Sequence, residues 1–143
     1  MRITVQTIPH RQQRYNTVGD WYSDKITGTV RIFVSELSNW RYELLVGVHE
    51  VVEAFLCMHD GVIEEAVDAF DKAFVSHSDE PGDDPKAPYQ KQHCIATGVE
   101  RILAACLGVK WLEYENALED LIIKREIEEK KNGQSTKAGE ASV

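Results

Sequence analysis

The run His49-Glu50-Val51-Val52-Glu53 carries the residue types best suited to chemistry in this chain. On a helix of 3.6 residues per turn, His49 and Glu53 are four residues apart and project from the same face, within reach of one ion. An imidazole nitrogen and a carboxylate oxygen both bind zinc-like ions at about 2.0–2.2 Å. We therefore predict that this run forms part of a divalent-metal site.

Further ligands must come from other segments, because two protein ligands do not complete a zinc site. His93 is the best additional candidate, and Glu100 lies on the same side of the same predicted helix. Packing of that side against the His49 helix would bring His93 and Glu100 to the pair. Asp71, beside the apolar stripe of another predicted helix, is a further ligand candidate or a neighbour of a ligand. The predicted cofactor is Zn²⁺ or another divalent metal.

Three short strands are predicted before the His49 helix, over residues 3–8, 17–23 and 29–34, where β-branched and aromatic residues alternate with polar ones. Gly28 can take a positive φ in the turn between the second and third strands, which favours an antiparallel hairpin. We expect a small antiparallel sheet that needs a cover on one face.

Four helices are predicted to supply that cover, over residues 39–60, 63–76 and 89–108 and from 111 onward. Ser38 or Asn39 can cap the start of the first helix, and Gly61 can end it. The apolar stripes expected to face inward are Leu44, Leu45, Val48, Val51, Val52, Phe55 and Leu56 on the first helix, and Ile95, Val99, Ile102, Leu103 and Cys106 on the third. His49 and Glu53 are expected at the edge of the first stripe.

The fold class predicted from these elements is α+β, with one domain over residues 1–131 and a disordered C-terminal tail over 132–143. Residues 77–88 contain three prolines and are predicted to form a surface loop that borders the site. A chain of 143 residues can bury a continuous core without disulfides or a structural metal.

The charge and the cysteines of the chain restrict its partners and its compartment. A net charge of −8 repels phosphate backbones, so we expect no nucleic-acid partner. The three cysteines lack Cys-x-x-Cys spacing, which favours a reducing, cytoplasmic compartment. No apolar segment is long enough to predict a membrane span or a signal sequence.

The motif His49-Glu50-x-x-Glu53 resembles the His-Glu-x-x-His helix of zincin metallohydrolases, with Glu53 in place of the second histidine. In that family an antiparallel sheet precedes the helix, as it does in the predicted order here. The resemblance implies that His49 and Glu53 bind zinc and that Glu50 is the general base. It also implies hydrolysis of an amide or peptide bond in a small-molecule or peptide substrate.

The whole sequence further resembles small uncharacterised proteins of tailed phages and prophages, including the loop Glu80-Pro81-Gly82-Asp83-Asp84-Pro85 and the pair Pro88-Tyr89. This resemblance implies a bacterial host cytoplasm and carries no established activity.

Two alternatives stand beside the metallohydrolase. Glu50-x-x-Glu53 and Glu65-x-x-Asp68 resemble the carboxylate pairs of all-α, MazG-like nucleotide pyrophosphohydrolases, whose carboxylates would hold Mg²⁺ and a triphosphate. The second alternative is a non-catalytic phage accessory protein that binds a host protein through an exposed surface. The acidic segment 79–84 and the tail would then serve partner binding or solubility.

Overall fold

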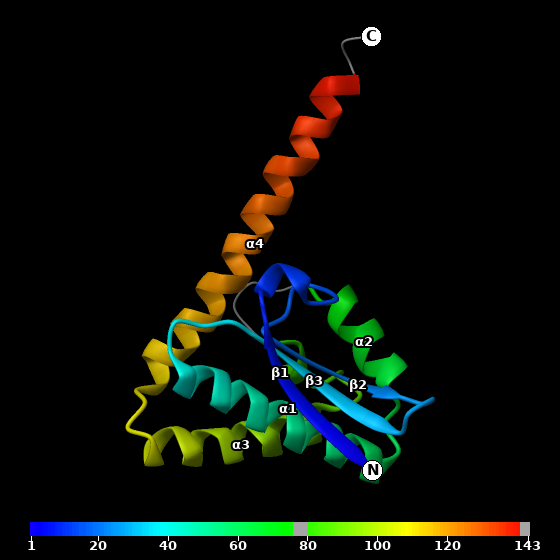
Figure 1. Cartoon of the computed structure of the whole chain (residues 1–143), viewed down its shortest axis with the longest axis vertical. Helices are drawn as coiled ribbons and strands as arrows, with labels where there is room; N and C mark the ends of the chain where they lie inside the picture. Colours follow the sequence, from blue (N-terminus) through cyan, green and yellow to red (C-terminus); the bar gives the residue numbers. More distant parts are fainter. Residues whose placement is uncertain (76–79, 141–143) are drawn as a thin grey trace.

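A three-stranded sheet and four helices make up the α+β fold of the computed structural model, which describes residues 1–75 and 80–140. The strands β1 (Arg2–Ile8), β2 (Gly19–Asp24) and β3 (Thr29–Ser35) lie in the order β1-β3-β2 (Figure 1). The strands β2 and β3 form the predicted antiparallel hairpin, and Gly28 in its turn has a φ of 64°. The predicted fold class is confirmed.

The pairing of β1 differs from the expectation of a wholly antiparallel sheet. This strand runs parallel to β3, with Val5 opposite Ile32, so the sheet is mixed. The connection over residues 9–18 is long enough for β3 to insert between β1 and β2, and strand patterns in a sequence do not specify the order of strands. As the central strand, β3 is the most buried, and Val30, Ile32 and Val34 are at most 2% exposed.

The helices α1 (Trp40–Asp60), α2 (Glu64–Ala73), α3 (Gln90–Cys106) and α4 (Trp111–Glu140) occupy the predicted places. The side chain of Asn39 caps α1 by accepting a hydrogen bond from the Arg41 backbone N–H at 3.1 Å. Gly61 ends the helix with a φ of 75°, as predicted. Helix α2 ends at Ala73, and the predicted end at residue 76 lies outside the described residues.

Helix α4 extends away from the rest of the molecule (Figure 1). It continues to Glu140, beyond residue 131, where the sequence predicts that a tail begins. The division into a domain and a tail stays a prediction, and residues 141–143 lie outside the described part of the chain. None of the described helices is long and apolar enough to cross a membrane.

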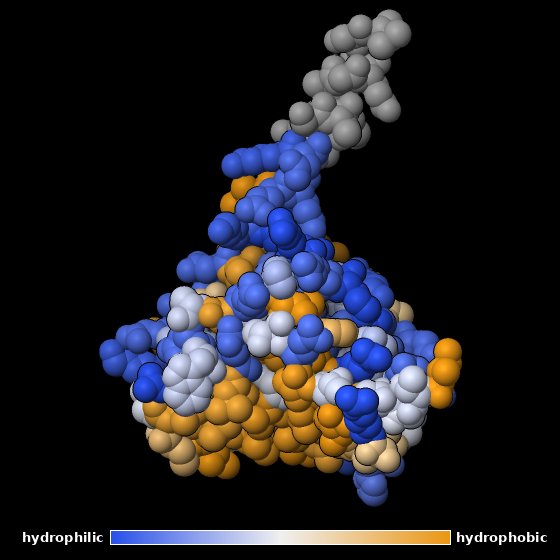
Figure 2. All heavy atoms as spheres, viewed as in Figure 1, coloured by the Kyte–Doolittle hydropathy of each residue, from blue (hydrophilic) through white to orange (hydrophobic). Residues whose placement is uncertain are grey.

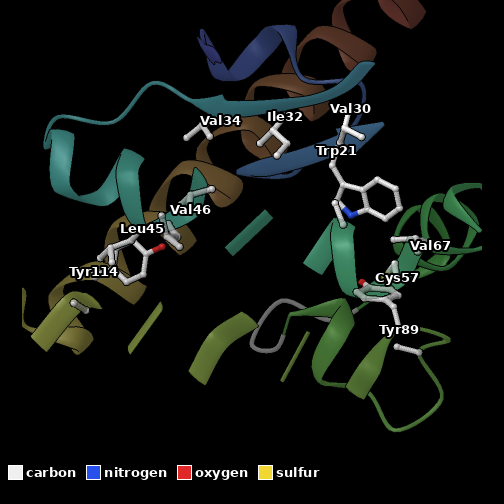
Figure 3. Packing of buried hydrophobic residues seen from close by; sticks show 14 residues of the cluster. Trp21, Val30, Ile32, Val34, Leu45, Val46, Cys57, Val67, Tyr89 and Tyr114 are labelled. Atoms are coloured by element: carbon white, nitrogen blue, oxygen red, sulfur yellow. The ribbon is translucent and has the colours of Figure 1, made fainter. Parts of the chain in front are cut away.

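The core lies between the sheet, α1 and the remaining helices. In Figure 3 the β3 side chains Val30, Ile32 and Val34 point from the sheet toward α1, where Leu45 and Val46 lie buried. Helix α1 contacts β2 and β3 on one side and α3 on another. It therefore connects the sheet to the segment that carries His93.

The predicted inward faces of α1 and α3 are confirmed only in part, since Leu45 is buried and Val51, Phe55 and Leu103 pack against the core. Helix α3 buries Gln92, His93, Ala96, Glu100 and Ala104, while its apolar residues Ile95, Val99, Ile102 and Cys106 are exposed. Helix α1 buries Leu45, Val46, Gly47, His49, Glu53, Ala54 and Cys57, whereas Leu44 is exposed and the rest of the predicted stripe except Leu45 is half-buried. Both helices are thus rotated so that their polar residues face each other.

Candidate metal centre

Antiparallel packing of α1 and α3 brings together residues far apart in the sequence. Near the end of α1, Asp60 accepts a hydrogen bond of 2.6 Å from the Gln92 side chain, at the start of α3. In the middle of α1, His49 contacts Glu100, farther along α3. This register places His93 beside Glu53 at the centre of the interface.

Three polar atoms of this interface converge on one point. His49 Nε2 lies 3.4 Å from Glu53 Oε2 and 3.2 Å from His93 Nδ1, and the last two atoms are 3.0 Å apart. All three residues are at most 7% exposed. Bonds of about 2.0–2.1 Å to a tetrahedral ion place its ligand atoms about 3.3–3.4 Å apart. The three atoms therefore already have nearly the spacing of one face of such a tetrahedron, and they could hold a metal ion.

His49 is oriented by a pair of buried residues behind it. Its Nδ1 lies 2.9 Å from Glu100 Oε2, and because a carboxylate only accepts, Nδ1 must donate the proton. When the imidazole is neutral, as it is in a metal ligand, its lone pair is therefore on Nε2, the atom that faces the cluster. The other oxygen of Glu100 accepts a hydrogen bond from the Tyr114 hydroxyl. A carboxylate behind a histidine in this way is typical of metal ligands.

The other two residues are also held at their outer atoms. Glu53 Oε1 accepts a hydrogen bond of 3.2 Å from Trp21 Nε1, which leaves Oε2 for the cluster. His93 Nε2 lies 3.2 Å from Glu80 Oε2 and 3.6 Å from Asp83 Oδ1. Each of the three residues thus has one polar atom in the cluster and one polar atom beside an outer partner.

Two glycines make room for this arrangement. A Cβ atom on Gly82 would lie 2.2 Å from Cγ of His93, so only glycine allows the 80–83 segment to pack directly on the imidazole. A Cβ atom on Gly19 of β2 would lie 2.3 Å from Glu50 Oε1. Neither glycine is predictable as part of the site, because a close approach of two segments has no local sequence signal. Trp21 and Tyr114, which hydrogen-bond to Glu53 and Glu100, were likewise not predicted as part of the site.

The cluster attracts positive charge. Burial lowers the pKa of His49, but hydrogen bonds to Glu100 and Glu53 outweigh burial and hold this pKa well above its ordinary value. Burial likewise opposes the charged form of His93, yet hydrogen bonding, chiefly to Glu53, raises its pKa to about 10. The same contacts overcome the effect of burial on Glu53 and lower its pKa to about 2. A divalent cation could replace the protons that this site holds so firmly.

Glu50 lies beside the cluster and, with it, lines a cavity of about 730 Å³. Its side chain is half-buried and packs against Gly19. Burial, followed by the charge of Glu53, raises the pKa of Glu50 well above its ordinary value. The residue predicted as general base therefore shares an accessible space with the three converging residues.

The remaining predicted ligands, Glu100 and Asp71, lie outside the converging set. Glu100 contacts the outer nitrogen of His49, as described above. Asp71 of α2 lines the cavity and accepts hydrogen bonds from the hydroxyls of Tyr15, at 3.1 Å, and Tyr89. Burial raises the pKa of Asp71 to about 6.

The carboxylates required by the pyrophosphohydrolase alternative do not form one group. Glu65 contacts Lys25 Nζ at 2.8 Å on the surface. Asp68 lies 2.8 Å from Arg14 and 3.0 Å from Lys72. These two residues are thus neutralised by cations of the chain itself, while Glu53 belongs to the histidine cluster.

Comparisons with protein-family models, curated proteins and solved structures found no match to this chain.

Proposed function

We propose that this protein binds Zn²⁺ or a similar divalent ion through His49 Nε2, Glu53 Oε2 and His93 Nδ1. The observation that carries the proposal is the mutual separation of these atoms, 3.0–3.4 Å, in a buried cluster. The outer atoms of His49 and Glu53 are hydrogen-bonded, and that of His93 lies beside Glu80. Hydrogen bonding alone does not require two imidazoles and a carboxylate to aim at one point. A shared cation accounts for that convergence.

The reaction that we propose is hydrolysis of an amide or peptide bond, by the zincin resemblance. Three protein ligands leave an open position, and a zinc ion in such a site supplies Lewis acidity and an activated water. Glu50 follows His49 on α1 and lines the same cavity, which supports a role as the general base that accepts a proton from water. It would then return that proton to the leaving amine.

The charge of the cavity wall supports an amide substrate over a nucleoside triphosphate. Carboxylates such as Glu115 and Glu119 line the cavity, together with the cations Lys72 and Arg101. Lys72 contacts Asp68, and Arg101 contacts Glu115 at 3.8 Å, so acidic neighbours offset both positive charges. A wall of this kind repels phosphates, whereas it accepts a neutral or cationic peptide.

Incubation of the zinc-loaded protein with a defined peptide mixture, followed by mass spectrometry of the products, tests this function. Wild-type protein should cleave peptides, and Glu50→Gln should retain zinc but lose about 100-fold or more of the rate. Asp120→Asn removes a carboxylate on α4 outside the cavity, so it serves as the matched control and should cleave normally. Zinc-loaded wild-type protein that leaves all peptides intact would contradict the hydrolase and leave only the metal site.

A further inference from the structure

An extended apolar surface lies on the outer side of α1, α3 and β1, away from the candidate metal centre. We call it the apolar face. On each element its members are half-buried or exposed. They are Ile3 and Val5 of β1; Leu44, Val48 and Val52 of α1; and Ile95, Val99, Ile102 and Cys106 of α3.

Helix geometry places the α1 and α3 parts of this face on the same side of the molecule. On α1, Val48 and Val52 each precede a cluster residue by one position, and on α3, Ile95 and Val99 each precede a buried residue by one position. One position along a helix corresponds to a rotation of about 100° around its axis, so each apolar stripe lies about 100° from the residues that contact the other helix. Two antiparallel helices are related by a two-fold axis perpendicular to both helix axes. Stripes that are rotated equally on the two helices therefore lie on the same side of the pair.

Strand β1 continues the face beyond α1. A Cβ atom on Gly47 of α1 would lie 3.3 Å from Cγ1 of Val5, so the strand runs directly beside the helix. Ile3 and Val5 nevertheless remain about half exposed, because β1 is an edge strand. Figure 2 shows a broad continuous apolar surface where Figure 1 draws α1 and α3.

We propose that this face joins two copies of the chain in a symmetric dimer. Six of its side chains are 38–69% exposed. They leave roughly 500 Å² of apolar surface in water, and the half-buried members add to it, whereas a standard interface buries about 800 Å² on each partner. Since about 56–65% of an interface is apolar, the face matches the apolar part of such an interface. It is also in the range of about 300–600 Å² that the largest, often functional, apolar patch on a monomer covers.

The absence of charge in the face favours a second copy as its occupant. None of its members carries a charge, although the chain as a whole has a net charge of −8. Two copies can therefore meet through this surface without opposing like charges, while their acidic surfaces elsewhere point away from each other. No member of the face lines the described cavity, so the dimer would leave the candidate metal centre accessible.

Sedimentation equilibrium of the full chain, over about 1–100 μM, tests the dimer. The expected mass of the wild-type species is twice 16.2 kDa. Ile102→Glu places a charge at the most exposed helical position of the face, and the two-fold axis introduces it twice. We expect dissociation to become on the order of 100-fold more favourable in this variant, with unchanged zinc content.

Ile127→Glu is the matched control, since Ile127 is a 46% exposed isoleucine on the projecting part of α4. It should leave the dimer intact.

Hydrogen exchange of the wild-type protein gives a second readout that needs no variant: the backbone amides of residues 44–55 and 95–106 should gain protection as the protein concentration rises. A monomer at all concentrations, capture of the monomer by lipid vesicles, or dissociation by Ile127→Glu instead of Ile102→Glu would overturn the proposal. Zinc content is measured on the same samples, so failure of the dimer and failure of the metal site are separate results.

Discussion

In an ordinary pair of amphipathic helices the apolar sides face each other and the polar sides face water. In the pair α1–α3 this arrangement is reversed. The inner side buries His49, Glu53, His93 and Glu100, whereas the outer side exposes residues such as Ile102. Burial of polar groups costs free energy unless each group has a partner, and every inner residue here has one. Polar and small residues, rather than the widest apolar stripes, therefore form the contact between these two helices.

Neighbouring residues on α3 provide the most severe test of this comparison. Ala96 is fully buried between the helices, whereas Ile95 is 43% exposed on the apolar face. We expect Ala96→Glu to lower the free energy of unfolding by about 3 kcal/mol or more, because it buries an unpaired charge. In the monomer, Ile95→Glu should cost less than about 1 kcal/mol. Urea denaturation of both variants in the Ile102→Glu background, which keeps the chain monomeric, measures these losses. The reverse order would show that α3 is rotated the other way.

A pair of glycines tests how tightly the inner side is packed. Gly82→Ala would place a methyl group 2.2 Å from Cγ of His93, so we expect a loss of about 1–3 kcal/mol in stability and a weakened metal site. Gly98 in α3 has no atom within 4 Å of such a methyl group. Gly98→Ala should therefore be neutral or stabilise the helix by up to about 1 kcal/mol. Equal effects of the two substitutions in thermal denaturation would argue against direct packing of the 80–83 segment on His93.

The buried carboxylate of Glu100, which contacts His49, tests how much the polar side of the α1–α3 pair contributes to metal affinity. Glu100→Gln keeps the shape of the side chain but removes the charge that orients the imidazole. We expect zinc affinity to fall by about 10–100-fold, as for other residues that hold a metal ligand from behind. Competition with a chromophoric chelator measures this change. Glu113→Gln, a surface substitution on α4, is the control, and an unchanged affinity in Glu100→Gln would separate Glu100 from the site.

The sequence alone predicted the elements well because their signals are local. Asn39, Gly28 and Gly61 act within a few residues of their own positions, and all three occupy the predicted places. The spacing of His49 and Glu53 likewise placed both on one helical face. His93 was predicted from its position on α3, and the structure brings it to this pair.

The orientation of the helices could not be predicted in the same way. The widest apolar stripe of a helix usually faces the core, and this rule selected Ile95, Val99 and Ile102. It fails here because small residues and the polar cluster occupy the interface. The order of strands and the approach of Gly82 to His93 are contacts between distant segments, for which the sequence has no local signal.

The pH dependence of the free energy of unfolding should show a smaller effect, which comes from Asp71. Its pKa of about 6 lies above the unfolded value near 4, so the folded state binds its proton more tightly. The resulting stabilisation is complete below about pH 4 and is lost as pH rises through 6. Asp71→Asn should flatten this part of the stability profile by on the order of 1–2 kcal/mol. Urea denaturation between pH 4 and 7 tests this, and parallel profiles for the two proteins would contradict it.

The most direct test of the candidate site is the metal content of the protein itself. Protein purified without a metal-affinity tag, and then incubated with Zn²⁺ and dialysed, should retain one zinc per chain in elemental analysis. His49→Ala and His93→Ala should each retain essentially none, while His59→Ala, which removes an exposed histidine at the end of α1, should behave as the wild type. A wild-type protein that binds no zinc, nickel, cobalt or manganese under these conditions would contradict the account.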